Sequence, residues 1–248
     1  MSRHIAIAII SITAVAVAGV ACYRLMSGGL AHVELSAERY PVRGLDLSAH
    51  NGVPDFDSIA AAGYTFVYLK ASEGVSHRDA AFMRNYLAAR RAGLLVGAYH
   101  FFRFDSDGAR QAANFLGAIS SAELQLPWAI DIEEWGNPVE TATAIVAERL
   151  ATMIAMVAPR RGAGMIYTNK NGDARFVRGH YDDDDMIDLW ICSFTDPPLT
   201  RRPWRIWQHS HSGHVPGVSG KVDLNVFNGD ASTWHSWLES VSLQTERK

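Results

Sequence analysis

Cysteine is scarce in this chain of 248 residues, which has only two, and the shortage excludes several kinds of site. Cys22 adjoins an apolar N-terminal run, so Cys192 is the only cysteine in the rest of the chain. One cysteine cannot form an internal disulfide, and a structural zinc site would need many other ligands. Because Cys192 follows the apolar residues Leu189, Trp190 and Ile191, we expect a buried, unreactive thiol.

The sequence also lacks an excess of positive charge. It has 23 Lys and Arg residues against 26 Asp and Glu residues, a formal net charge of −3, and it contains no Lys/Arg block. Nonspecific binding of nucleic acid needs a basic field, so nucleic acid is not an expected partner. There is no internal repeat, and no glycine-rich phosphate fingerprint follows the first predicted strand. We expect no cofactor.

The one long apolar run lies at the N-terminus, where Arg3 precedes residues 5–21. A basic start followed by such a run is typical of an export signal. The run is near the lower limit of ~17 residues for a membrane span, so it would also serve as a retained anchor. We therefore expect a signal peptide or membrane anchor over 1–22 and a linker over 23–40. The protein is expected to be exported, periplasmic or secreted, or membrane-associated through residues 5–21.

From residue 41 onward, apolar runs with strand character alternate with helical patterns. Such alternation predicts a barrel domain over 41–243, followed by a short tail over 244–248. The predicted strands are 43–47, 65–71, 94–102, 128–133, 164–168, 188–193, 205–209 and 222–227. The predicted helices are 56–62, 78–92, 106–119, 138–157 and 233–241.

The last connections are too short for crossover helices, which need a dozen or more residues. The sequence therefore predicts an irregular α/β barrel in which about five βα units precede three strands with little helix between them. We expect the strands to be parallel. A doubly wound open sheet is the structural alternative.

Carboxylates lie where three predicted strands bring them to one face. Asp46 ends the first strand, Asp131 and Glu133 end the fourth, and Asp223 lies on the eighth. Reactive groups of such barrels are found at the C-terminal ends of the strands. These four acids are therefore the candidate catalytic residues.

Asp131 and Glu133 alternate with isoleucines, so the period of two along a strand places both carboxylates on one face. Their expected separation of roughly 6–7 Å lies between the ranges for retaining and inverting glycosidases. Two such groups in a partly apolar pocket should differ in pKa, so that one donates a proton and the other stays charged. The alternatives are solvated or Arg-paired acids and a site for a hard cation. No His-rich ligand spacing supports a metal.

Other strand ends carry candidate substrate-binding residues. Lys70 and Glu73 lie around the end of the second strand, where a simple ion pair that lines the barrel is the alternative. Further candidates end later strands, with core packing as an equal alternative: Tyr99, Tyr167, Trp190 and Gln208. The chain has seven tryptophans, which suit sugar stacking and a large core equally well. The acidic run over residues 182–185 indicates a solvated loop, with calcium binding as the alternative.

Taken together in order, the strand motifs resemble glycoside hydrolase family 25, the Chalaropsis-type lysozymes. The resemblance covers roughly residues 42 to 227. It is carried by the segments Arg43–Ser48, Tyr68–Gly74, Val96–Phe101, Asp131–Glu133, Ile166–Asn169, Leu189–Ile191, Trp207–Gln208 and Val222–Asn225.

This resemblance implies an irregular (β/α)5(β)3 barrel with N-acetylmuramidase activity on peptidoglycan glycan strands. It implies that Glu133 is the general acid and that Asp131 orients or stabilises the acetamido group of the substrate. Asp46 and Asp223 would complete an acidic floor. The sequence leaves open another N-acetylated glycan such as chitin, and a glycan-binding protein without turnover. It also leaves open whether the mechanism is retaining, inverting or substrate-assisted.

Overall fold

The computed structural model describes residues 35–182, 186–194 and 198–246. The predicted signal peptide or anchor and the first part of the predicted linker lie outside these ranges. Within them, no helix is both long and apolar enough to span a bilayer. Tyr40, at the end of the predicted linker, is buried against the barrel, and its ring centroid lies 6.0 Å from that of Trp207.

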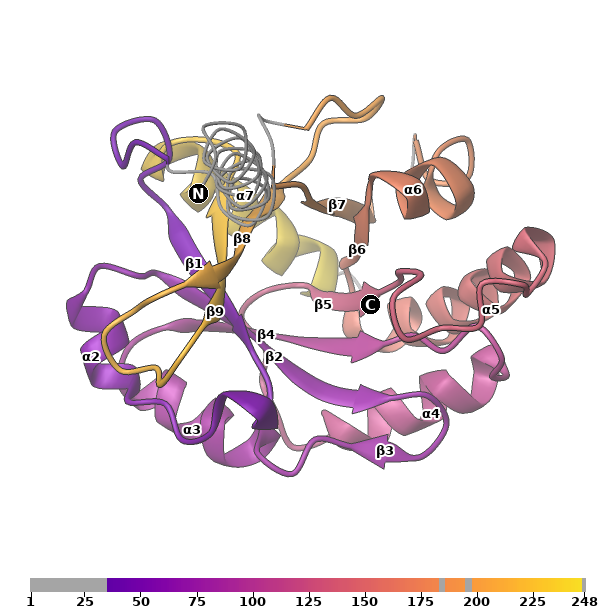
Figure 1. Ribbon diagram of the computed structural model, residues 1–248, viewed down its shortest axis with the longest axis horizontal. Coiled ribbons are helices and arrows are strands. Elements are labelled where there is room, and N and C mark those ends of the chain that lie inside the picture. Colours follow the sequence, from indigo (N-terminus) through magenta and orange to yellow (C-terminus); the bar gives the residue numbers. More distant parts are fainter. Residues whose placement is uncertain (1–34, 183–185, 195–197, 247–248) are drawn as a thin grey trace, which may run out of the picture.

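Most of the sheet closes on itself as a barrel (Figure 1). Each strand pairs with the next around the ring, and pairing between the first two strands completes the closure. The barrel strands are β1 (Arg43–Leu47), β2 (Phe66–Glu73), β4 (Leu95–Phe101), β5 (Trp128–Asp131), β6 (Gly164–Asn169), β7 (Ile187–Cys192), β8 (Ile206–Gly213) and β9 (Val222–Phe227).

The strand β9 runs antiparallel to both of its neighbours, β8 and β1, whereas β1, β2 and β4 to β8 are parallel to one another. The prediction of parallel strands throughout is therefore wrong for β9. Only residues 214–221 join β8 to β9. A connection this short cannot carry a helical crossover, so the chain turns back as a hairpin.

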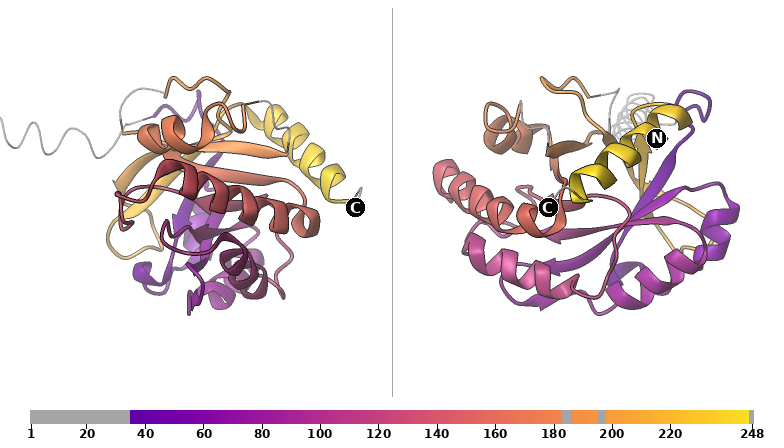
Figure 2. Two further views of the ribbon diagram at one scale, coloured as in Figure 1. Left: turned by 90° about the vertical axis from the view of Figure 1, so that its right-hand side faces the viewer. Right: turned by 180° about the vertical axis from the view of Figure 1, so that it is seen from behind.

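Helices cover the outside of the sheet. Figure 2 shows α3 (Phe82–Arg91), α4 (Gly108–Ala118) and α5 (Thr143–Arg161) following one another around it. The shorter helical segments are η1 (Ala49–Asn51), α2 (Phe56–Ala61), α6 (Lys170–Gly172) and the π-helical turn η2 (Asp173–Val177), and α7 (Ala231–Glu246) ends the described chain.

Two helices begin at least one full turn later than predicted. Residues 77 and 78 form β3 (His77–Arg78), which pairs with the end of β2, so α3 begins only at Phe82. The helix predicted from 138 begins at Thr143, because residues 134–141 form turns closed by bonds such as Asn137 N–H to the carbonyl of Glu134. Both helix starts are set by contacts with other segments, which the local sequence pattern does not contain.

Inside the barrel, aromatic rings form a continuous column from α7 to the C-terminal ends of the strands. Trp234 of α7 stacks on Phe66 at a centroid distance of 5.3 Å, and Phe66 contacts Tyr68 at 6.3 Å. Tyr68 lies 4.6 Å from Trp190, which contacts Tyr167 at 4.8 Å. The helix α7 therefore closes one end of the barrel. The aromatic column supports the side chains at the C-terminal ends of the parallel strands, at the opposite end.

Candidate active site

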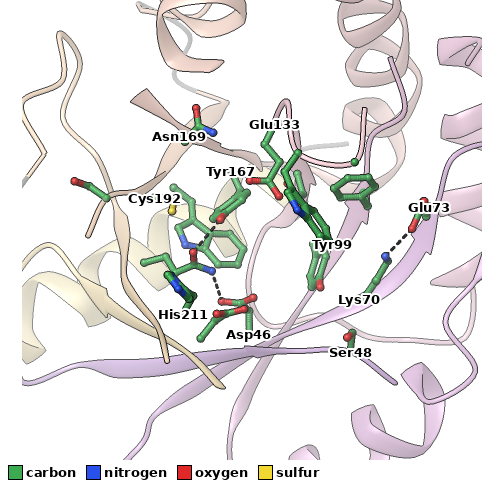
Figure 3. A pocket seen from close by; sticks show the side chains of 18 of the residues that line it. Asp46, Ser48, Lys70, Glu73, Tyr99, Glu133, Tyr167, Asn169, Cys192 and His211 are labelled. Carbon is green, nitrogen blue, oxygen red and sulfur yellow. Dashed lines mark hydrogen bonds and ion pairs between the residues drawn. The ribbon is translucent and has the colours of Figure 1, made fainter. Parts of the chain in front are cut away.

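A pocket of about 1060 Å³ opens at the C-terminal ends of the parallel strands (Figure 3). Every residue that the sequence analysis selected as catalytic or substrate-binding contributes to its lining. These residues are Asp46, Lys70, Glu73, Tyr99, Asp131, Glu133, Tyr167, Trp190, Gln208 and Asp223. The pocket thus brings together groups carried by every strand of the closed barrel.

The acids reach the pocket in two ways. Asp46 and Asp131 lie at the ends of parallel strands, as expected, and Glu133 follows two residues after β5 ends. Asp223 instead lies at the start of the antiparallel β9, where it is the register partner of Asp46. The reversed direction of β9 therefore delivers Asp223 to the same end of the barrel.

The predicted alternation around the acidic pair is confirmed. Ile130 and Ile132 are fully buried in the core between the sheet and the helices, whereas Asp131 and Glu133 line the pocket. Because successive side chains of a strand point to opposite faces, the isoleucines anchor the strand while the acids face the cavity.

Asp46 is held at the floor by two relays of hydrogen bonds that end at its Oδ2. The hydroxyl of Tyr167 donates to Oε1 of Gln208 at 2.9 Å, and Nε2 of Gln208 donates to Asp46 at 2.9 Å. The indole of Trp190 donates to Oδ1 of Asn225 at 2.8 Å, and Nδ2 of Asn225 donates to Asp46 at 2.8 Å. An indole N–H only donates, so Trp190 fixes the orientation of the Asn225 amide.

This network favours the charged form of Asp46 over that of Asp223. Burial raises the pKa of Asp46, but bonds from Asn225, Gln208 and Asp223 each oppose the increase. Burial, the charge of Asp46 and the bond to Asp46 raise the pKa of Asp223 to about 9. Asp223 is therefore protonated at neutral pH and donates to the carboxylate of Asp46.

The second acidic pair, Asp131 and Glu133, comes from the end of β5 and the residues just after it. Burial, followed by the charge of Asp46, raises the pKa of Glu133 to about 7. Burial and then the charge of Glu133 raise the pKa of Asp131 well above its usual range. The buried Oδ1 of Asp131 has no hydrogen-bond partner in the structure. The pair thus keeps a proton near neutral pH and offers an unused acceptor atom to a ligand.

Lys70 and Glu73 form an ion pair of 2.7 Å on one side of the pocket, apart from Cys192 and His211 (Figure 3). Residues three apart on a regular strand would face opposite ways. The register of β2 with β4 shifts between Lys70 and Ser72, and this bulge returns Glu73 to the face of Lys70. The ion pair that was the alternative interpretation is therefore present, and both residues also line the pocket, where they remain candidates for substrate binding.

Cys192 is less buried than predicted, since its side chain is partly exposed and lines the pocket. Burial raises the pKa of its thiol to about 12, opposed by a hydrogen bond with Tyr167. The thiolate that would act as a nucleophile is therefore scarce at neutral pH. The expectation of an unreactive thiol rests on this pKa rather than on complete burial.

Sequence reasoning missed several residues around the pocket. They include Ser48, His50, Arg103, Trp135, Asn169, Lys170, Asn171, Phe194 and His211. Most lie just beyond a strand end, where no periodic pattern extends. Asn225 was also missed as a functional residue, although it alternates with Asp223 along β9 and so shares its face.

Clustered acidic side chains could hold a cation at two places, the pocket and the acidic run over 182–185. The described part of the chain contains no cluster of three or more His, Cys, Asp or Glu residues arranged to hold a metal ion. In the acidic run over 182–185, only Asp182 lies within the described residues, and it pairs with Arg201 at 3.2 Å. The other three positions lie outside the described residues.

Known proteins share both the sequence pattern and the fold. The sequence model of glycosyl hydrolases family 25 matches residues 45–218. Lysozyme M1 from Streptomyces globisporus is 33% identical over 216 residues, which is 79% of this chain and 71% of the relative.

Two solved structures share the fold of this chain. A family 25 glycosyl hydrolase from Bacillus anthracis superposes with a TM-score of 0.75 at 29% identity, covering 83% of this chain and 96% of the other. A bacterial lysozyme from Streptomyces coelicolor gives 0.70 at 30% identity, covering 81% and 98%. Because the family match spans residues 45–218 and both solved structures cover more than four fifths of this chain, this chain belongs to glycosyl hydrolase family 25.

Proposed function

We propose that the chain is a peptidoglycan hydrolase that cleaves the β-1,4 bond between N-acetylmuramic acid and N-acetylglucosamine, with Glu133 as the general acid. The observation that carries this assignment is the pKa of Glu133, about 7, in a pocket with an acidic floor. A carboxyl group with such a pKa is still protonated in a large fraction of molecules near neutral pH and can transfer its proton to a leaving oxygen. Membership of a glycosidase family that includes lysozymes supports the reaction class.

In the reaction, the bond between the anomeric carbon and the bridging oxygen breaks while the proton of Glu133 passes to that oxygen. Positive charge develops on the sugar, and the Asp46 carboxylate in the floor stabilises it electrostatically. Water completes the hydrolysis, either directly or after attack by the acetamido oxygen of the substrate. The anomer released first distinguishes these routes, because direct attack inverts the configuration and substrate assistance retains it.

Asp131 orients the substrate through its unpartnered Oδ1. An acetamido N–H of the substrate that donates to this atom stabilises the charged form of Asp131. The shared proton of the pair then stays on Glu133, where cleavage needs it. This role fits an N-acetylated sugar and does not require a metal or a cofactor.

The decisive experiment compares the full chain with its Glu133→Gln variant on purified peptidoglycan and on chitin. We expect new reducing ends from peptidoglycan, and a loss of about 10²–10⁴-fold in kcat in the variant with an unchanged circular dichroism spectrum. Glu140→Gln is the matched control, because Glu140 is exposed in the same connection and does not line the pocket. Release from chitin alone, or binding without release by the unmutated protein, would contradict the proposal.

We also propose that residues 5–21 direct export, because a basic residue precedes a largely apolar run without charged residues there. The mature barrel would then meet peptidoglycan outside the cytoplasm. Fractionation of cells that express the chain with and without residues 1–22 tests this proposal. Equal amounts of both forms outside the cytoplasm would refute it.

A further inference from the structure

The geometry points to Trp135 as a stacking platform for a sugar ring of the glycan strand next to the cleaved bond. This inference rests on the proposed function and extends it to how the polymer is held. All seven tryptophans lie in the described part of the chain, and Trp135 differs from the rest in its exposure. It is 77% exposed, whereas the other six are buried: Trp128, Trp190, Trp204, Trp207, Trp234 and Trp237.

The exposed indole lies where a ligand would meet it. Trp135 follows Glu133 by two residues and lines the same pocket as the four acids. A large apolar ring left in water at the rim of a polar cleft is a common feature of binding sites. Packing in the protein interior therefore explains the presence of the other six tryptophans. Ligand binding in the pocket explains the exposed Trp135.

The segment that carries Trp135 is anchored on both sides. Nδ2 of Asn137 donates to the carbonyls of Glu133 and Phe102, each at 2.9 Å, and Oδ1 of Asn137 accepts from the N–H of Phe104 at 2.8 Å. The guanidinium of Arg103 donates to the carbonyl of Gly136. The backbone of the acid and that of the indole are thus tied to the same neighbouring loop, which fixes their relative position.

Trp135 also has a supporting ring beneath it. The rings of Phe101 and Trp135 pack edge to face at a centroid distance of 6.4 Å and an interplanar angle of 78°. The ammonium group of Lys70 lies 5.1 Å from the centroid of Phe101. Such edge-to-face packing restrains an exposed ring and reduces the ordering cost when a ligand stacks on it.

The side chains around Trp135 suit a pyranose ring as the bound group. A sugar ring carries C–H groups on its faces and hydroxyl or amide groups around its edge. The face of Trp135 suits the C–H groups, while the carboxyl groups of Asp131 and Glu133 suit the polar edge. An apolar peptide side chain would use the indole but would leave these carboxyl groups unpaired, so we assign the platform to the glycan.

Binding is measured by calorimetry on the Glu133→Gln background, which does not depend on turnover. The probe is a tetrasaccharide of alternating N-acetylglucosamine and N-acetylmuramic acid without peptide stems. We expect Trp135→Ala to weaken binding about tenfold, which corresponds to ~1.4 kcal/mol. Trp135→Phe should keep most of the affinity because it retains a flat ring, and Trp135→Leu should behave like the alanine variant because it does not.

The matched control is Val139→Ala, since Val139 is an exposed apolar residue of the same connection that does not line the pocket. It should leave the affinity unchanged. With active enzyme, Trp135→Ala should raise KM about tenfold with little change in kcat, as expected when ground state and transition state lose equal binding.

Equal affinity of the Glu133→Gln protein with and without the added Trp135→Ala substitution would overturn the inference, as would an effect seen only when peptide stems are present. Failure of the proposed function looks different. In that case the unmutated protein releases no reducing ends from peptidoglycan, whereas the binding assay still reports on Trp135.

Discussion

Glu133 owes its raised pKa first to burial and second to the negative charge of Asp46. The same residue would titrate near 4.5 in an unfolded chain and would be almost fully ionised at neutral pH. The environment of one side chain therefore decides whether this pocket holds an acid catalyst. Asp46 keeps its charge because three neighbours donate to it, and one of these donors is the protonated Asp223.

The pH dependence of kcat/KM should show an alkaline limb near the pKa of Glu133, about 7. Glu133 must be protonated to donate, so activity falls as the pH rises through that value. Asp46→Asn removes a charge that raises this pKa, and the limb should move to lower pH by roughly one unit. Asp223→Asn is the control, because Asp223 is already neutral and asparagine still donates. A larger shift in Asp223→Asn than in Asp46→Asn would contradict this account.

Glu133 also links stability to pH. Its pKa is higher in the folded protein than in the unfolded chain, so between pH 4.5 and about 7 the folded state binds more protons. Stability from this group is therefore lost as the pH rises through that window. Glu133→Gln should be more stable than the unmutated protein by ~1 kcal/mol or more at pH 8, or about 2–4 °C in Tm. The two Tm values should converge near pH 4, and a constant gap across the whole range would rule out the linkage.

At the scale of the strands, three glycines face aromatic residues across the sheet. Gly44 is the register partner of Phe66, and Gly97 is the partner of Tyr68. A Cβ atom added at Gly97 would lie only 2.3 Å from the ring of Tyr68, and one at Gly44 would lie 2.2 Å from that of Phe66. A third pair of the same kind joins Gly164 to Trp128. Each glycine leaves room for a ring to lie over the adjacent strand.

Gly97→Ala should therefore destabilise the barrel by about 1–3 kcal/mol, the usual cost of overpacking a well-filled core. Tyr68 contacts Trp190 in the pocket wall, so kcat should also fall as the floor shifts. Urea denaturation and activity per folded molecule measure the two effects. The control is Gly117→Ala on α4, where the nearest atom is the mobile end of Arg78 and the helix gains from alanine. If both variants unfold at the same urea concentration, the packing argument fails.

At the scale of the molecule, α7 closes the end of the barrel opposite the pocket. Trp234 and Trp237 pack on Phe227 at centroid distances of 4.9 and 5.4 Å. The indole of Trp237 also donates to Asp188 of β7 at 2.8 Å. The last helix thus belongs to the barrel core rather than to a separate layer.

Trp234→Ala should lower the free energy of unfolding by ~3–5 kcal/mol, because a large ring would leave a cavity in the interior. The KM of the remaining folded enzyme should change little, since the pocket lies at the far end of the aromatic column. Ser236→Ala is the control on the exposed side of α7. Denaturation curves for the two variants that coincide within ~0.5 kcal/mol would show that α7 does not stabilise the barrel.

Local patterns in the chain predicted the positions of all barrel strands and the face on which Asp131 and Glu133 lie. The period of two is a property of a few consecutive residues, so it could be recognised without the fold. The starts of α3 and α5 were placed too early, because β3 and the turns before Thr143 depend on contacts with other segments. Trp135 could not be distinguished from the buried tryptophans, since exposure is decided by what surrounds a residue in space.

The sequence alone determined that Asp131 and Glu133 would face the same side, because an extended backbone points alternate side chains in the same direction. Tertiary structure alone decided that β9 runs backwards and places Asp223 against Asp46, a residue from the opposite end of the barrel sequence. It also decided which acid holds the proton. A pKa depends on burial and on nearby charges, and both come from residues that only folding brings together.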